Sequence, residues 1–326
     1  MRFFKHISAR TVSEACSLLR KYHGKARLNA GGTDLLSMLK GESLFNYPEA
    51  LIDIKTISGL DYIREDGDTL KIGALTRLSD IAISALLGQS YKVLVKAAYS
   101  VATPQVRNMA TLGGNLCQDV RCWYYRYPRH IGGPMRCLRK GNGPCLAVSG
   151  DNRYHAIIGG KKCFAVCPSD IAVALAALNA QMKIESPKGE RRIAVTDFFG
   201  TLGNGLKRDE MVTEIEVPRV PGPAKQTFLK FTLRRPVDFA IVSVASVITV
   251  EGGICSEARI ALGAIAPAPV RARKAEEVIK GRSIEQKAAM EAAEQAVAGA
   301  KPLSRNAYKV EITRRLVERA ILTQDD

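Results

Sequence analysis

The sequence lacks any uninterrupted run of 18 apolar residues, and its first ten residues, MRFFKHISAR, lack the apolar stretch of a secretory signal. We therefore expect no membrane span and a cytoplasmic location. Acidic residues are scarce, with 32 Asp and Glu against 48 Lys and Arg, so the net charge is +16. A positive net charge of this size would favour binding to nucleic acid, but the sequence contains no helix-turn-helix, zinc-finger or RNA-recognition signature. We expect no nucleic-acid partner.

Cysteine is sparse outside one segment, and six of the eight cysteines lie between residues 117 and 167. The only tryptophan, Trp123, lies there too, and residues 121–162 contain nine Lys and Arg against one acidic residue, Asp151. Glycines and prolines interrupt the segment, which excludes long helices and strands. A segment that is rich in cysteine, basic and irregular is typical of a chain folded around a metal centre.

Three interpretations of these cysteines stay open on spacing alone. The first is structural thiols, or disulfides in a secreted protein, but this chain shows no secretory signal and is long enough to form its own core. Structural zinc usually uses paired C-x2-C knuckles, but the successive gaps here are four, fourteen, seven, seventeen and three residues. An iron–sulfur cluster on four thiolates tolerates loose spacing, and nearby basic residues would offset its negative charge and raise its reduction potential.

The N-terminal 55 residues have an α/β pattern. Thr11 and Glu14 have capping-box spacing in front of an apolar helical face that includes Cys16, which we expect to be buried. A short strand follows at residues 26–29, then the turn Ala30–Asp34 with its paired glycines, then a helix over residues 35–40. A strand, a glycine turn and a helix start together predict an anion site, because backbone N–H groups point at one place.

The rest of the chain predicts an α+β protein. We expect strands at residues 51–55 and 70–74, helices at 78–87, 91–100 and 171–180, and strands with one short helix over 181–218. The Pro- and Gly-rich stretch 218–225 marks a domain boundary. Residues 226–268 alternate as an antiparallel sheet, and residues 270–324 predict helices broken near Gly281 and Pro302. The expected domains are 1–55, 56–220 with an insertion at 117–167, and 225–326.

Six stretches carry a resemblance to a known family: LNAGGTDLL (Leu28–Leu36), LIDI (Leu51–Ile54), KIGALT (Lys71–Thr76), QVRNMATLGGNLCQD (Gln105–Asp119), PSDIAVAL (Pro168–Leu175) and LKFTLRRPVDFAI (Leu229–Ile241). With them the chain resembles the FAD-binding subunit of the molybdenum hydroxylase, or xanthine dehydrogenase, superfamily. It is most similar to the medium (beta) subunit of 4-hydroxybenzoyl-CoA reductase. The resemblance implies an FAD-binding fold of two α/β subdomains of the PCMH type, followed by an α+β domain like that of CO dehydrogenase flavoprotein.

The resemblance also implies which residues bind FAD, and no catalytic side chain is expected. Backbone amides of the glycine turn would hold the pyrophosphate, Asp170 would accept hydrogen bonds from ribityl or ribose hydroxyls, and Lys230 would stabilise an anionic reduced flavin. The implied FAD-binding residues are Leu28, Asn29, Ala30, Gly31, Gly32, Thr33, Asp34, Leu35, Val101, Thr111, Gly114, Asn115, Gln118, Asp170 and Lys230.

For the cysteine segment the resemblance implies a [4Fe–4S] cluster with four ligands: Cys122, Cys137, Cys145 and Cys163. About nine residues more than in the reductase branch, around 152–160, lie between the third and fourth ligands, and Cys167 is an alternative fourth ligand.

The implied function is electron transfer within a molybdenum-cofactor oxidoreductase. A molybdopterin-binding large subunit and a [2Fe–2S] small subunit would be partners, and ferredoxin or a similar protein would exchange electrons with the cluster. Two alternatives stay open. The chain could serve an anaerobic xanthine, purine or N-heterocycle dehydrogenase, or it could be a zinc-binding nucleic-acid or scaffold protein.

Overall fold

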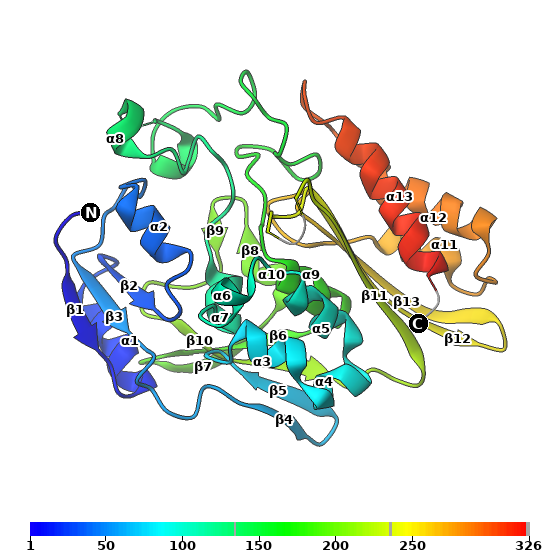
Figure 1. The fold of residues 1–326 in the computed structure, drawn as a ribbon, viewed down its shortest axis with the longest axis horizontal. Helices are drawn as coiled ribbons and strands as arrows, with labels where there is room; N and C mark the ends of the chain where they lie inside the picture. Colours follow the sequence, from blue (N-terminus) through cyan, green and yellow to red (C-terminus); the bar gives the residue numbers. More distant parts are fainter. Residues whose placement is uncertain (134, 235–236, 324–326) are drawn as a thin grey trace.

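The computed structural model describes residues 1–133, 135–234 and 237–323 (Figure 1). The N-terminal subdomain is a parallel sheet in the order β1-β3-β2, flanked by two helices. Every residue of its central strand is buried, as expected for a parallel strand covered on both faces. The elements are β1 (Lys5–Ser8), α1 (Val12–Lys21), β2 (Ala26–Asn29), α2 (Leu35–Lys40) and β3 (Ala50–Asp53).

A second, antiparallel sheet has the order β4-β5-β10-β6-β7. Its central strand β10 comes last in the sequence and pairs with β5 on one side and β6 on the other. All residues between β5 and β6, including the cysteine segment, therefore leave this sheet and return to it. The strands are β4 (Ile63–Asp66), β5 (Thr69–Gly73), β6 (Gln181–Ser186), β7 (Gly189–Ala194) and β10 (Met211–Pro218).

Short helices connect β5 to the cysteine segment. The predicted helix over residues 78–87 is two helices, because Ser84 leaves helical geometry and caps the second one by accepting a hydrogen bond from the Leu87 N–H. The helices are α3 (Leu78–Ile83), α4 (Ala85–Ser90), α5 (Lys92–Tyr99), α6 (Pro104–Arg107) and α7 (Leu112–Cys117).

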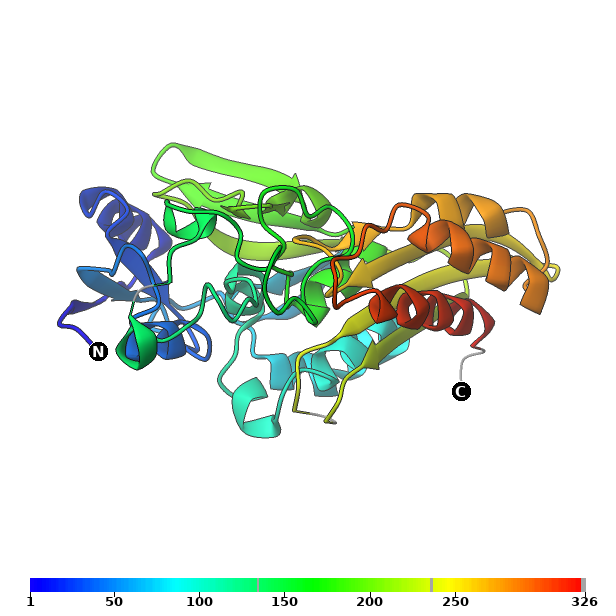
Figure 2. The same cartoon turned by 90° about the horizontal axis from the view of Figure 1, so that it is seen from above.

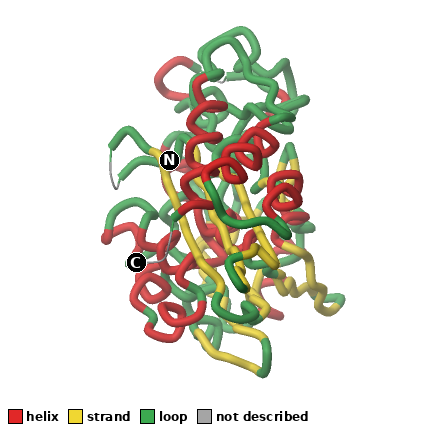
Figure 3. The backbone as a smooth tube through the Cα atoms, turned by 90° about the vertical axis from the view of Figure 1, so that its right-hand side faces the viewer, coloured by secondary structure: helices red, strands yellow, loops and turns green. Residues whose placement is uncertain are grey.

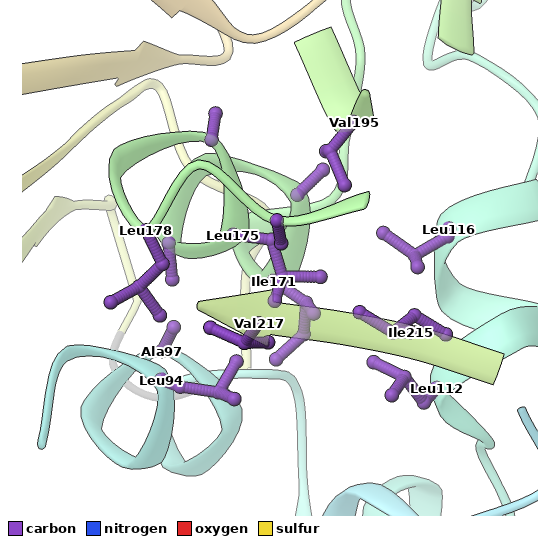
Figure 4. Packing of buried hydrophobic residues seen from close by; sticks show 14 of the residues in the cluster. Leu94, Ala97, Leu112, Leu116, Ile171, Leu175, Leu178, Val195, Ile215 and Val217 are labelled. Carbon is purple, nitrogen blue, oxygen red and sulfur yellow. The ribbon is translucent and has the colours of Figure 1, made fainter. Parts of the chain in front are cut away.

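Helix α9 (Asp170–Ala177) is the centre of the main core, and all eight of its residues are buried. It begins at Ser169, whose hydroxyl accepts a hydrogen bond from the Ala172 N–H. Figure 4 shows Ile171 and Leu175 of α9 meeting the side chains of β10. Further core residues come from α5, α7, β10 and the start of α10 (Val195–Phe198): Leu94, Ala97, Leu112, Leu116, Val195, Ile215 and Val217.

The C-terminal domain is an antiparallel sheet in the order β11-β12-β13-β14, with three helices over one face (Figure 2). Alternate residues of β12 face opposite sides, so Ala245 and Val247 join the core around α9, whereas Val244 and Ile248 pack under the three helices. The elements are β11 (Ala224–Phe231), β12 (Val242–Glu251), β13 (Ile254–Gly263), β14 (Val270–Arg271), α11 (Arg273–Ile279), α12 (Gln286–Val297) and α13 (Tyr308–Leu322).

The cysteine segment is built mainly of loops, which form the top of the molecule (Figure 3). Its regular elements are the single turns α8 (Arg129–Gly132) and η1 (Leu138–Lys140). This agrees with the irregular structure predicted from its glycines and prolines. Arg235 and Pro236, in one of the six family-like stretches, lie outside the described residues. No helix in the described ranges is long and apolar enough to cross a membrane.

Candidate functional site

A cleft of about 1000 Å³ lies between the N-terminal subdomain and the rest of the chain. The glycine turn after β2 lines one side, and the segment around α7 lines another. The two-stranded hairpin of β8 (Phe199–Gly200) and β9 (Gly203–Asn204) also lines the cleft. The volume is in the upper range of ligand sites, which suits a dinucleotide.

The paired glycines hold the turn against a neighbouring segment. A Cβ atom on Gly31 would lie 1.9 Å from the backbone oxygen of Met109, so a side chain there would force the two segments apart. Gly32 has φ +69°, in the left-handed region that favours glycine. The turn therefore presents bare backbone to the cleft, as close contact with a ligand requires.

Asp34, at the end of this turn, is tied to the cysteine segment. Its carboxylate accepts hydrogen bonds from Arg121 Nη1 at 2.8 Å, Arg126 Nη2 at 3.1 Å and the Asp119 N–H at 3.0 Å. Burial acts to raise the pKa of Asp34, but the guanidinium of Arg121 and the hydrogen bond from Arg126 outweigh it and hold the pKa below its usual value. The glycine turn and the cysteine segment thus form one unit.

The second glycine run lies at the start of α7. Thr111 caps the helix by accepting a hydrogen bond from the Gly114 N–H at 3.2 Å, and a Cβ atom on Gly114 would lie 2.9 Å from the Thr111 hydroxyl oxygen. Asn115 Oδ1 accepts a 2.6 Å hydrogen bond from Ser169, which caps α9. This network fixes α7 and α9 relative to the cleft.

Asn29, at the end of β2, lines the cleft and is buried, yet its Oδ1 atom has no hydrogen-bond partner among the described residues. A buried polar atom without a partner is costly and needs an explanation. A bound molecule with a donor at this point would satisfy it. The amide-lined turn and this acceptor therefore fit FAD.

Asp170 and Lys230 form a buried ion pair, with 2.7 Å between Lys230 Nζ and Asp170 Oδ2. Lys230 Nζ also donates to the backbone oxygen of Ser100, next to Val101. Burial raises the pKa of Asp170, and the charge of Lys230 opposes this effect. The pair joins α9 to β11.

The structure divides the predicted FAD-binding residues into two groups. Among the described residues, four are absent from the lining of the cleft: Val101, Asn115, Asp170 and Lys230. The others line it: Leu28, Asn29, Ala30, Gly31, Gly32, Thr33, Asp34, Leu35, Thr111, Gly114 and Gln118.

Three of the four predicted cluster ligands share a small buried group. Cys137 and Cys163 pack together with Tyr125 and Val120, and Cys122 lies against them. Cys163 and Cys145 are near enough to Cys122 to add to the raised pKa of its thiol, so the fourth predicted ligand lies in the same neighbourhood. All eight cysteines are free thiols, so the disulfide interpretation has no support among the described residues.

Burial raises the pKa of Cys122 to about 11, while the backbone N–H groups of Tyr125 and Tyr124 act in the opposite direction. Across the described ranges, no three His, Cys, Asp or Glu side chains stand close enough to hold one metal ion. A four-iron cluster needs a wider arrangement, because each thiolate binds a different iron.

The two remaining cysteines of the segment, Cys117 and Cys167, line the cleft instead. Burial raises the pKa of each to about 12. Both are therefore uncharged thiols that belong to the cleft.

The cleft and the cysteine group share a wall. Met38, Leu44, Val120 and Tyr125 line the cleft and also pack in the group that contains Cys137 and Cys163. Sequence reasoning did not identify this wall, because its residues are common core types. The aromatic run next to Cys122 was the available signal for Tyr125.

Sequence reasoning also missed His155. Its Nε2 atom lies 3.3 Å from Cys122 Sγ, and the side chain is almost fully buried. Burial lowers the pKa of His155 to about 4, with a further contribution from Lys309. Its place within the extra residues around 152–160 was the only signal in the sequence.

Comparison with known families gives two matches that cover almost the whole chain. Residues 2–220 match the FAD binding domain in molybdopterin dehydrogenase, and residues 227–324 match the CO dehydrogenase flavoprotein C-terminal domain.

Individual relatives agree with these matches. The chain is 33% identical to the aldehyde oxidoreductase FAD-binding subunit PaoB of Escherichia coli (strain K12), over 97% of this chain and 96% of the relative. It is 28% identical to the nicotinate dehydrogenase FAD-subunit of Eubacterium barkeri, over 86% and 81% of the two chains. Among solved structures, a chain of the carbon monoxide dehydrogenase from Hydrogenophaga pseudoflava that lacks the Mo-pyranopterin moiety superposes with a TM-score of 0.79. That chain is 29% identical, and the match covers 98% of this chain and 96% of the other.

Proposed function

Because the chain belongs to the family of FAD-binding subunits of molybdenum hydroxylases, we propose that it transfers electrons through FAD and a [4Fe–4S] cluster held in the cysteine segment. The chain is an oxidoreductase flavoprotein subunit, and its fold is that of the CO dehydrogenase medium chain, which confirms the expected α+β class. The cofactors would supply the redox chemistry, and this chain would supply spacing and electrostatics.

The observation that carries the proposal is the wall shared by the cleft and the cysteine group. With FAD in the cleft and a cluster on the cysteines, the side chains of Met38, Leu44, Val120 and Tyr125 would lie between the two. The Asp34 contacts to Arg121 and Arg126 would hold this spacing constant. In such an arrangement electrons could pass between the FAD and the cluster.

For FAD, we propose that the turn Leu28–Leu35 holds the pyrophosphate, with Thr111, Gly114 and Gln118 lining another side of the cleft. The bare backbone at Gly31 and Gly32 supports this placement. Val101, Asn115, Asp170 and Lys230 stay assigned to the site by family resemblance alone. Asn115 would act by fixing α7 and α9 through Ser169.

For the cluster, we propose Cys122, Cys137, Cys145 and Cys163 as ligands. The buried group supports Cys163 over Cys167 as the fourth ligand, because Cys163 packs with Cys137 whereas Cys167 lines the cleft. The zinc alternative predicts a compact set of ligands around one ion, and the described residues offer none.

We further propose that the chain works with a molybdopterin-binding large subunit and a [2Fe–2S] small subunit, and that a ferredoxin-like protein exchanges electrons with the cluster. The named relatives are FAD subunits of an aldehyde oxidoreductase and of a nicotinate dehydrogenase, so similar FAD subunits serve enzymes with different substrates. We therefore propose that the large subunit selects the substrate. Similarity to the hydroxybenzoyl-CoA reductase branch rests on the cysteine segment. The divisions 1–55, 56–220 and 225–326 are the proposed domains.

An absorption spectrum of the chain purified without oxygen, together with flavin and iron analysis, tests the proposal. Flavin bands, a broad iron–sulfur shoulder, one FAD and about four irons per chain are expected. Co-expression with candidate partner subunits should give a complex that contains molybdenum. Zinc in place of iron, or turnover of an aldehyde, purine or aromatic-CoA substrate by this chain alone, would contradict it.

A further inference from the structure

A histidine lies against one of the proposed cluster ligands. His155 Nε2 is 3.3 Å from Cys122 Sγ, and the residue is 1% exposed. The ring also packs against Trp123 and Tyr124, with centroid distances of 5.8 and 5.9 Å. Because aromatic rings surround this buried histidine, the Cys122 sulfur is the hydrogen-bonding atom next to its Nε2 nitrogen.

Buried polar side chains of the C-terminal domain hold this histidine in place. The backbone oxygen of His155 accepts hydrogen bonds from Asn306 Nδ2 and Lys309 Nζ, both at 3.1 Å. Asn152 is fully buried. Its Nδ2 group donates a hydrogen bond to the Ser304 hydroxyl, and its Oδ1 atom accepts one from the Arg305 N–H. The extra residues of the cysteine segment are thus anchored to α13 and the loop before it. Moving the histidine away from Cys122 would break these hydrogen bonds.

The hydrogen-bonding chemistry fixes the direction of the contact. A neutral imidazole has one N–H donor and one acceptor nitrogen. A cysteine that ligates iron is a thiolate, which can only accept, so a favourable contact requires the proton on Nε2. Nδ1 is then the acceptor, and it has no partner in the described part of the chain.

We infer that His155 donates an Nε2–H hydrogen bond to the Cys122 thiolate and thereby raises the reduction potential of the cluster, an inference that rests on the proposed function. Hydrogen bonds to ligand sulfurs are among the features that set cluster potentials. A donor to the sulfur stabilises the reduced state, because that state carries one more negative charge. His155 is a positioning residue here, because it would act on the cluster through the sulfur of Cys122.

The test is an anaerobic redox titration of the cluster, followed by electron paramagnetic resonance, on the co-expressed complex. His155→Leu fills the same space without a donor, and His155→Gln can place an amide N–H near the same sulfur. His130→Leu is the matched control, because His130 is an exposed histidine of the same segment.

His155→Leu should keep about four irons per chain and show a lower midpoint potential than the wild type. His155→Gln should lie closer to the wild type, and His130→Leu should not differ from it. An unchanged potential in His155→Leu overturns the inference. Loss of iron from both His155 variants also overturns it, because the residue would then hold the cluster or the loop. A wild-type chain without iron refutes the proposed function itself.

Discussion

The hydroxyl of Tyr125 donates a 2.6 Å hydrogen bond to Asp119 Oδ2, across the wall between the cleft and the cysteine group. Burial raises the pKa of Tyr125, and the Asp119 carboxylate adds to the effect, so the phenol stays protonated. Asp119 also donates its backbone N–H to Asp34. One residue pair therefore connects the glycine turn to the side chains that cover Cys137 and Cys163.

Tyr125→Phe should lower the free energy of unfolding by about 1 kcal/mol, because one hydrogen bond is lost and the ring is kept. Tyr125→Ala should cost about 3–5 kcal/mol, because it removes a buried ring from the wall. Urea denaturation of both variants measures this difference. Full iron content in Tyr125→Ala would show that the wall is not needed to hold the cluster.

Gly32→Val should abolish FAD binding and destabilise the chain by about 1–3 kcal/mol, because a β-branched residue at φ +69° is strained. Gly67→Val is the control: its φ is +60° and its Cβ would meet open space in the β4–β5 turn. The control should show similar strain and keep its flavin. Flavin release and quantification give the occupancy. A folded Gly32→Val variant with full occupancy would refute the placement of the pyrophosphate.

Serine substitution of Cys122, Cys137, Cys145 or Cys163 should each remove about four irons per chain and leave FAD bound. Cys117→Ser and Cys167→Ser should keep the iron, because both residues line the cleft. Iron and flavin counts on anaerobically purified variants measure the outcome. If Cys167→Ser loses the cluster and Cys163→Ser keeps it, Cys167 is the fourth ligand.

Lys230→Met should cost about 3–5 kcal/mol, because it leaves the buried carboxylate of Asp170 without its cation. The double variant Asp170→Asn/Lys230→Met should recover part of this loss. Lys25→Met, which breaks an exposed pair with Glu49, should leave the denaturation midpoint nearly unchanged. Equal losses in the single and double variants would mean that the pair does not couple α9 to β11.

Lys309 should make stability increase with pH above neutrality. Burial lowers the pKa of its amine from 10.5 to about 7. Between these values the unfolded chain keeps the proton and the folded chain releases it, so raising the pH favours the folded state. The stability difference between wild type and Lys309→Met should grow by at most about 1.4 kcal/mol per pH unit from pH 7 to 10. Parallel curves for the two proteins would show that Lys309 keeps its proton.

Local patterns predicted much of the fold. The capping box is present in part: the Glu14 N–H donates to Thr11, but the Glu14 side chain accepts from the Arg10 N–H. Cys16 is buried, as its helical face predicted. The breaks near Gly281 and Pro302 separate α11, α12 and α13. Each of these signals depends on residues close together in the sequence.

Long-range pairing could not be predicted in this way. Nothing in residues 211–218 indicates that β10 lies between β5 and β6, because its apolar pattern suits any buried strand. The pairing of Asp170 with Lys230 could not be predicted for the same reason, because sixty residues separate the two in the sequence. His155 was missed for a third reason: a lone histidine has no spacing pattern, and its role depends on Asn306 and Lys309 far along the chain.

The central position of β10 also affects how the protein is made. During synthesis β5 emerges from the ribosome long before β10, and at 5–20 residues per second the gap is on the order of ten seconds. Throughout that interval the main sheet lacks its middle strand. The cysteine segment lies between β5 and β10 in the chain, so it emerges before the interval ends. The thiols of the cysteine segment therefore meet solvent before this sheet is complete, and the lining of the cleft is not complete until Met211 and Val212 of β10 have joined the sheet.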